Sequence, residues 1–242
     1  LMLVPGMVRE RSPEALIHHS FETPWPWPSD LEILPTSWRY EILSSLLSAD
    51  VLSFPSKNDI IAFVTCVTEN LGAEVGLTSD AGGSMLVASN GRTTRLTVAP
   101  AATRSERFNS VVEFDATKRF ISDLSDDNYR HTFVTVDRAE PHKNIVRSIN
   151  AFGDLLKKRP ELVEDVRYLL FLTPGPTHIS AYKRLSDEIR RAARRVNEKA
   201  PGKQPVKVVE ENNFYRAVAA LSIYDTLISV PVVDGSGRSA ID

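Results

Sequence analysis

The sequence predicts an α/β fold in which strands and helices alternate along the chain. Short apolar runs alternate with helix-like stretches from one end to the other, the pattern of parallel α/β layers. The chain has 242 residues, of which 42% are hydrophobic and 25% charged, enough for one large domain or two small ones. Neither an internal repeat nor a low-complexity segment interrupts the pattern. We therefore expect a globular protein with Rossmann-like parts.

Composition argues against several classes of protein. The net charge of −2 gives no general attraction for nucleic acid or anionic lipid. A single cysteine, Cys66, allows no internal disulfide and fits a reducing compartment, so we expect a cytoplasmic protein. No apolar run is long enough to span a bilayer, and no signal-peptide pattern is present. Because Leu1 is not an initiator, we expect the chain to be part of a longer gene product.

The first half predicts a sequence of strands and helices. Residues 15–19 and 51–54 read as strands, and residues 38–49 as a helix with one apolar face. Ser56, three residues before Asp59, predicts the capped start of a second helix, with Cys66 near its inward face as a small hydrophobic residue.

A hairpin and a crossover are expected to follow. Asn90-Gly91 lies between the apolar runs 85–87 and 96–98, which favours a type I′ turn. Residues 99–102 would lead to a charged helix over 105–124, and the turn-rich residues 125–128 would mark a boundary.

The second half predicts a parallel sheet with interleaved helices. Strands are expected at 133–136, 168–172, 206–209 and 226–230, with helices at 145–156, 182–196 and 214–223. Such a sheet binds ligands at the carboxyl ends of its strands. Arg138, Lys143 and Asp234 all fall at such ends.

Arg138 and Lys143 are the strongest candidates for chemistry. They follow an apolar run and precede a helix, so the helix N-terminus would add backbone N–H donors beside two cations. Such a pair is suited to a diphosphate and neutralises charge on a departing nucleotide. The spacing of Arg138 and Lys143 alone is weak evidence for a diphosphate site, because two solvated surface cations produce the same pattern.

Four segments in the same order resemble trehalose-6-phosphate synthases, retaining glycosyltransferases of family 20. The family patterns are H-D-Y-H-L-M-L-V-P, H-I-P-F-P…L-L-P, V-D-R-L-D-Y-T-K-G and T-P-L-R-D-G-M-N-L-V-A-K-E. The matching segments are Leu1–Arg9, Pro24-Trp25-Pro26 with Leu34-Pro35, Val136-Asp137-Arg138 with Lys143, and Val230-Pro231 with Asp234-Gly235.

The resemblance implies a GT-B fold, two Rossmann-like domains facing a cleft, each incomplete in this chain. Residues 1–124 would form the latter part of the N-terminal, acceptor-side domain, and residues 125–242 a truncated nucleotide-sugar donor domain. The implied reaction moves glucose from UDP- or GDP-glucose to a sugar phosphate. No metal or other cofactor is implied, because Arg138 and Lys143 neutralise the leaving group. A homo-oligomer is possible under this interpretation.

The resemblance also assigns a donor-binding loop. Asp234 would contact the donor sugar hydroxyls, and the backbone of Gly235, Ser236 and Gly237 would meet the phosphates. Asp242 stands where the family has a ribose-binding glutamate. Arg238 either contacts a phosphate or is an ordinary surface arginine. The stretch departs from the family at Ser236-Gly237-Arg238, so its side-chain contacts with the donor differ.

Glu22 is the main departure from the family pattern. It stands where H-I-P-F-P has a histidine beside the reacting sugar. A carboxylate there can accept hydrogen bonds or act as a base or nucleophile. It can equally mark an altered substrate or lost activity. Two alternatives to the synthase are therefore open: a pseudo-glycosyltransferase that couples cyclitols through a cyclitol-phosphate acceptor, and a catalytically lapsed regulatory homologue.

Two further motifs allow more than one interpretation. Trp25-Pro26-Trp27-Pro28 forms either a platform that stacks on a sugar or a hydrophobic plug over the core. His18 and His19 are adjacent on the expected strand and point to opposite faces, so they make a poor metal pair.

Overall fold

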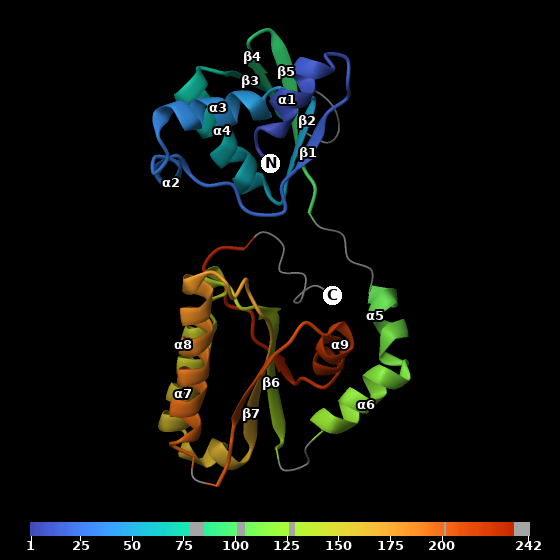
Figure 1. Cartoon of the computed structure of the whole chain (residues 1–242), viewed down its shortest axis with the longest axis vertical. Coiled ribbons are helices and arrows are strands. Elements are labelled where there is room, and N and C mark those ends of the chain that lie inside the picture. Colours follow the sequence, from blue (N-terminus) through green and yellow to red (C-terminus); the bar gives the residue numbers. More distant parts are fainter. Residues whose placement is uncertain (78–84, 101–104, 126–128, 201, 235–242) are drawn as a thin grey trace. The chain divides into compact units, whose positions relative to one another are not determined.

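The computed structural model describes residues 1–77, 85–100, 105–125, 129–200 and 202–234. The chain divides into two compact units, Leu1–Ala102 and Thr103–Asp242 (Figure 1). None of the helices within these ranges combines the length and the low polarity needed to cross a membrane.

The first unit is a five-stranded mixed sheet with helices on one face. The sheet order is β1-β2-β5-β4-β3, with β1, β2 and β5 parallel and β4 antiparallel to both of its neighbours. Leu52, Phe54 and Leu96 pack from the sheet into the core that α3 and α4 supply. The elements are α1 (Val4–Arg11), β1 (His18–Ser20), α2 (Pro28–Leu31), α3 (Thr36–Leu46), β2 (Val51–Phe54), α4 (Lys57–Leu71), β3 (Glu74–Leu77), β4 (Met85–Ser89) and β5 (Arg92–Val98).

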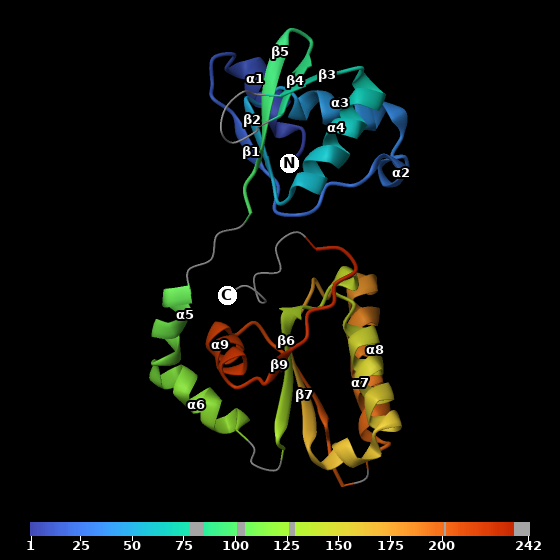
Figure 2. The ribbon, with the colours of Figure 1, turned by 180° about the vertical axis from the view of Figure 1, so that it is seen from behind.

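The second unit is a parallel sheet covered on both faces. The strand order is β8-β7-β6-β9, and each neighbouring pair is parallel. Helices α7 and α8 cover one face, and α6 and α9 cover the other (Figures 1 and 2). The elements are α5 (Ser105–Val112), α6 (Asp115–Leu124), β6 (His131–Arg138), η1 (Pro141–Lys143), α7 (Ile145–Lys158), η2 (Pro160–Glu164), β7 (Val166–Thr173), α8 (Ser180–Asn197), β8 (Val206–Glu210), α9 (Phe214–Ser222) and β9 (Thr226–Leu227).

The most local predictions are confirmed. Asn90 and Gly91 both have positive φ, 48° and 75°, as a type I′ hairpin between β4 and β5 requires. The Ser56 hydroxyl accepts the Asp59 N–H and donates to the Asp59 carboxylate at the start of α4. Cys66 is fully buried, and burial raises the pKa of its thiol, in agreement with a hydrophobic role.

Two predicted strands are displaced or shortened. Instead of 15–19, β1 begins at His18, because the Arg9 guanidinium binds the carbonyl oxygens of Pro13 and Ala15 and holds that segment away from the sheet. The predicted strand 226–230 ends at Leu227. The next residue, Ile228, still bonds to Val134 and Thr135 of β6, and two residues further on the Val230 carbonyl oxygen accepts a hydrogen bond from the Asn144 side chain instead.

The predicted helix over 105–124 is two helices, broken at Phe114, whose backbone is extended. Both helices pack against α9, and the Phe114 ring contacts Tyr215. This packing places them with the second unit, so the division falls at 102/103 rather than at the predicted 124/125. Residues 126–128 of the predicted boundary turn lie outside the described residues.

The loop after β1 is anchored at both of its ends. Phe21 and Trp25 are 7% and 4% exposed, and both pack on Phe54. The backbone N–H of Phe21 donates to the Ser53 carbonyl oxygen. The backbone N–H of Trp25 donates to the buried Asp59 carboxylate at 2.9 Å. Trp25 is therefore a plug in the core, whereas Trp27 is 48% exposed and keeps the alternative of a contact surface.

We predict that Asp59→Ala lowers the free energy of unfolding of the first unit by about 2–4 kcal/mol, because the buried Trp25 N–H and the capped helix start lose a charged acceptor. Glu69→Ala, on the exposed face of the same helix, is the control and should change it by no more than about 0.5 kcal/mol. Urea unfolding followed by tryptophan fluorescence measures both. Equal effects of the two substitutions would contradict the anchoring role of Asp59.

Candidate functional site

Arg138 and Lys143 lie where the sequence predicts them, at the carboxyl end of a central strand. Arg138 is the last residue of β6, and Lys143 ends the short helix η1. The longer helix α7 begins two residues later, at Ile145. The loop therefore brings two cations and a helix N-terminus to one edge of the sheet, where parallel α/β folds bind ligands.

Lys143 is held between two carboxylates. Its Nζ lies 2.8 Å from Asp234 Oδ2 and 2.9 Å from Asp137 Oδ1. The three side chains are 10%, 19% and 16% exposed, so the cluster is largely shielded from water. Burial alone would lower the pKa of Lys143, but the hydrogen bonds and charges of Asp234 and Asp137 outweigh it and raise the pKa above its ordinary value. Lys143 is thus charged at neutral pH.

Arg138 has a more open environment. Its guanidinium is 64% exposed and pairs with Glu140 at 2.9 Å. The other carboxylate oxygen of Glu140 lies 3.4 Å from His142 Nδ1. The Asp137 carboxylate accepts the backbone N–H of Arg138 at 2.8 Å, in addition to its contact with Lys143. Arg138 can therefore reach an incoming anion without unfolding the loop.

The segment that follows β9 is bonded to this loop at several points. The Val232 N–H donates to the His142 carbonyl oxygen at 2.8 Å, and Asn144 Nδ2 donates to the Val230 carbonyl oxygen at 3.0 Å. Together with the Lys143–Asp234 pair, these bonds bring Asp234 to the same edge as Arg138, although they are far apart in the sequence. Asp137, Glu140 and Asn144 were not predicted as site residues. The alternating charges of residues 137–143 were the available signal.

The other predicted site residues lie in the first unit or outside the described residues. Glu22 is an exposed residue between the anchored Phe21 and Trp25, in the first unit. Gly235, Ser236, Gly237, Arg238 and Asp242 lie outside the described residues. Among the residues that the structure describes, no group of three or more His, Cys, Asp or Glu side chains is arranged to hold a metal ion.

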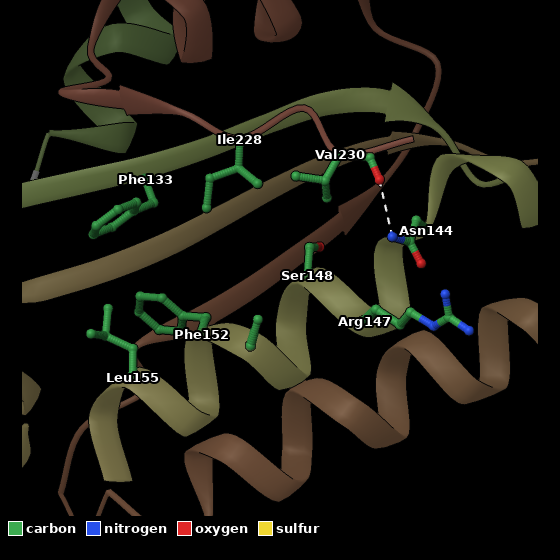
Figure 3. A pocket seen from close by; sticks show the side chains of 9 residues that line it. Phe133, Asn144, Arg147, Ser148, Phe152, Leu155, Ile228 and Val230 are labelled. Atoms are coloured by element: carbon green, nitrogen blue, oxygen red, sulfur yellow. Dashed lines mark hydrogen bonds between the residues drawn. The ribbon is translucent and has the colours of Figure 1, made fainter. Parts of the chain in front are cut away.

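An apolar cavity of about 390 Å³ lies beside α7 (Figure 3). Its walls come from β6, α7 and the segment after β9, and the apolar side chains of Phe133, Phe152 and Ile228 are among those that line it. Asn144 and Val230, joined by their hydrogen bond, stand at one end of it in Figure 3. Neither Arg138, Lys143 nor Asp234 lines this cavity, so it is separate from the charged site.

The fold matches solved structures of GT-B glycosyltransferases. A UDP-forming α,α-trehalose-phosphate synthase from Burkholderia xenovorans, in complex with glucose-6-phosphate, aligns with a TM-score of 0.88 at 19% identity. The alignment covers 99% of this chain and 53% of that one. An E. coli trehalose-6-phosphate structure bound with UDP-2-fluoro glucose aligns with a TM-score of 0.83 at 21% identity, over 97% of this chain and 51% of that one. The predicted fold class, α/β of the GT-B type, is thereby confirmed.

The family follows from the sequence itself. The profile of glycosyltransferase family 20 matches residues 1–239, and the chain belongs to that family. A bifunctional trehalose-6-phosphate synthase/phosphatase from Thermoproteus tenax is 26% identical over 239 residues, which are 97% of this chain and 32% of the relative. A UDP-forming α,α-trehalose-phosphate synthase from Arabidopsis thaliana is 25% identical, again over 97% of this chain but 24% of the relative. The chain spans about a third or less of these two relatives.

We predict that the two site cations differ in their importance for stability. Lys143→Met should lower the free energy of unfolding of the second unit by about 2–4 kcal/mol, because it leaves two shielded carboxylates without their cation. Arg138→Met, at an exposed pair, should cost no more than about 1 kcal/mol. Because the pKa of Lys143 is raised in the folded protein, its contribution to the free energy of unfolding is complete below the ordinary lysine pKa of about 10.4. This contribution is lost as the pH rises through the pKa of Lys143 in the folded protein.

Urea denaturation at pH 7 measures these differences. Adding Asp234→Asn to Lys143→Met should restore part of the lost stability, because it removes one of the repelling charges. If Lys143→Met and Arg138→Met cost the same, or the second substitution adds a full further loss, the shielded cluster does not have the role assigned to it.

Proposed function

We propose that the protein transfers glucose from UDP-glucose to a sugar phosphate, and that Arg138 and Lys143 bind the diphosphate of the donor. The observation that supports the proposal is the placement of both cations at the carboxyl end of β6, ahead of α7, in a chain of glycosyltransferase family 20. In this proposal the second unit binds the donor. Transfer itself is proposed for the whole protein, since the relatives are longer than this chain.

The cations act on the leaving group. As the bond between the sugar and the diphosphate breaks, negative charge grows on the departing nucleoside diphosphate, and preorganised cations stabilise it. Arg138 is exposed and can form two parallel hydrogen bonds to phosphate oxygens. Lys143 supplies a point charge from the shielded interior of the loop. The N-terminus of α7 adds backbone donors beside them.

Asp234 has two roles in the proposal. In the free protein it neutralises Lys143, with which it pairs at 2.8 Å. When the donor binds, the diphosphate competes for Lys143, and the Asp234 carboxylate becomes available to accept hydrogen bonds from sugar hydroxyls. The remaining donor contacts are proposed to come from the backbone of residues 235–237 and from the side chains of Arg238 and Asp242, as the resemblance to the family implies.

Two structural neighbours support the choice of substrates. One is bound with UDP-2-fluoro glucose, and another is in complex with glucose-6-phosphate. For this chain, UDP-glucose and a sugar phosphate are accordingly the proposed donor and acceptor. A GDP-sugar donor, a cyclitol-phosphate acceptor, a homo-oligomer and a cytoplasmic location stay predictions from the sequence.

Glu22 is proposed to face the reacting sugar. It follows the end of β1, at the carboxyl edge of the first sheet, and the loop is fixed on both sides by Phe21 and Trp25. This edge is where parallel sheets bind ligands. The carboxylate can take the place of the family histidine as an acceptor of sugar hydroxyls.

A calorimetric comparison of UDP and UDP-glucose tests the diphosphate site. Arg138→Ala should weaken UDP binding by about tenfold to a hundredfold or more, because it removes charge-assisted hydrogen bonds that contribute about 1.5–3 kcal/mol each. Asp234→Asn should instead tighten UDP binding by about tenfold, because Lys143 loses a competing carboxylate, and it should remove much of the added affinity of UDP-glucose over UDP. Arg159→Ala, an exposed arginine paired with Glu161, is the control and should change neither affinity. UDP binding that is unaffected by Arg138→Ala would contradict the proposed function.

Glu22→Gln tests the sugar contact, since it keeps the side-chain shape and removes the charge. We expect transfer from UDP-glucose to glucose 6-phosphate to change in rate or in donor-sugar preference by about tenfold or more, while UDP affinity stays within about twofold. Glu14→Gln, at another exposed glutamate before β1, is the matched control. Normal kinetics of the Glu22 variant would sink the assignment. Restored activity on Glu22→His would favour the lapsed homologue.

A further inference from the structure

Asn144 joins two elements in an unusual backbone conformation. Its φ of 61° and ψ of 25° lie in the left-handed region, at the point where η1 ends and α7 begins. Asparagine tolerates this region better than most residues, although glycine occupies it without strain. The family pattern V-D-R-L-D-Y-T-K-G has glycine at this position. The backbone therefore explains why few residues fit here, but it does not explain why asparagine replaces glycine.

The Asn144 side chain does not cap the helix that it precedes. An asparagine at a helix start commonly accepts a hydrogen bond from the first turn, and no such bond forms at α7. Its amide Nδ2 donates instead to the carbonyl oxygen of Val230, 86 residues away in the sequence, at 3.0 Å (Figure 3). The side chain thus joins the loop that carries Arg138 and Lys143 to the segment that carries Asp234.

Beyond Ile228, which still bonds to β6 through Val134 and Thr135, that segment lies outside the sheet. Residues 228–234 belong to no helix or strand. Val230, Val232 and Val233 are 45%, 62% and 56% exposed, so burial of apolar surface contributes little to their position. Consecutive residues of the loop bind them instead: the His142 carbonyl oxygen accepts from Val232, Lys143 pairs with Asp234, and Asn144 donates to Val230.

We infer that Asn144 is a positioning residue of the donor site, which fixes the segment 230–234 so that Asp234 stays beside Lys143. The inference rests on the proposed function, because it assigns Asn144 an indirect part in reading the donor sugar through Asp234. Asn144 itself touches neither the diphosphate nor the sugar in this account. Without its amide donor, the segment keeps the Val232 bond and the ion pair that the donor has to break.

The test compares Asn144→Gly with Asn144→Asp and a matched control. Glycine keeps the left-handed backbone and loses the donor, and aspartate keeps the shape and loses the donor. Asn90→Gly is the control, because Asn90 also has positive φ but lies in the hairpin of the first unit. Hydrogen exchange of the Val232 amide, followed by NMR, reports on the segment without any ligand. Both Asn144 variants should speed this exchange by about tenfold, and Asn90→Gly should leave it unchanged.

Calorimetry with UDP and UDP-glucose then separates positioning from general stability. Asn144→Gly should reduce the ratio of UDP-glucose affinity to UDP affinity by about threefold to tenfold, the range for one neutral hydrogen bond. In the Asp234→Asn background it should cause no further reduction, because the positioned carboxylate is already gone.

Unchanged hydrogen exchange of the Val232 amide in the Asn144 variants would overturn the inference. So would a reduction of the UDP-glucose to UDP affinity ratio that is equally large in the wild-type and Asp234→Asn backgrounds. A wild-type protein that binds neither UDP nor UDP-glucose would contradict the proposed function instead. In that case the Val232 exchange alone decides whether Asn144 fixes the segment.

Discussion

The arrangement of the candidate site depends on the Lys143 ammonium, which lies between the Asp137 and Asp234 carboxylates. One carboxylate belongs to strand β6 and the other to the segment after β9, so a single cation joins two parts of the chain that are far apart in sequence. Each carboxylate is less than one-fifth exposed, and two such anions would repel if the cation were absent. The ion pair therefore sets where Asp234 lies, while the hydrogen bonds of Val232 and Asn144 set the path of the chain that leads to it.

In this arrangement the cations of the candidate site are already paired with carboxylates of the same protein. Arg138 and Lys143 face the carboxylates of Asp137, Glu140 and Asp234, so two cations meet three anions among the described residues. A diphosphate gains the full benefit of either cation only after it displaces a carboxylate that already occupies it. In the proposed function this competition would be useful, because a carboxylate displaced from lysine can accept a hydrogen bond from a sugar hydroxyl. In the proposed function, a nucleoside diphosphate without its sugar offers that carboxylate no hydroxyl, and this would disfavour the product relative to the donor.

The sequence was most informative where structure is decided within a few residues. The capped start of α4 at Ser56 and the Asn90-Gly91 turn depend on near neighbours, and both were predicted correctly. The displaced start of β1 depends on Arg9, which binds the Pro13 and Ala15 carbonyl oxygens, and apolar periodicity carries no information on such a bond. The path of the chain after β9 likewise involves a distant residue, Asn144, which bonds to the Val230 carbonyl oxygen. The position of Lys143 was predictable from its spacing after β6, but its pairing with Asp234 comes from the tertiary fold.

The structure adds to the interpretation of Glu22, the residue that stands where the family pattern has a histidine. Substitutions in a loop often accompany changes in the packing beneath it, yet the residues on either side of Glu22 are firmly packed. Phe21 and Trp25 lie in the aromatic core with Phe54 and Phe63, and the Asp59 carboxylate binds the Trp25 backbone. Glu22 itself is exposed and is not part of this aromatic core. The packing of the loop therefore does not account for the departure, and this supports the proposal that Glu22 acts on the substrate rather than on folding.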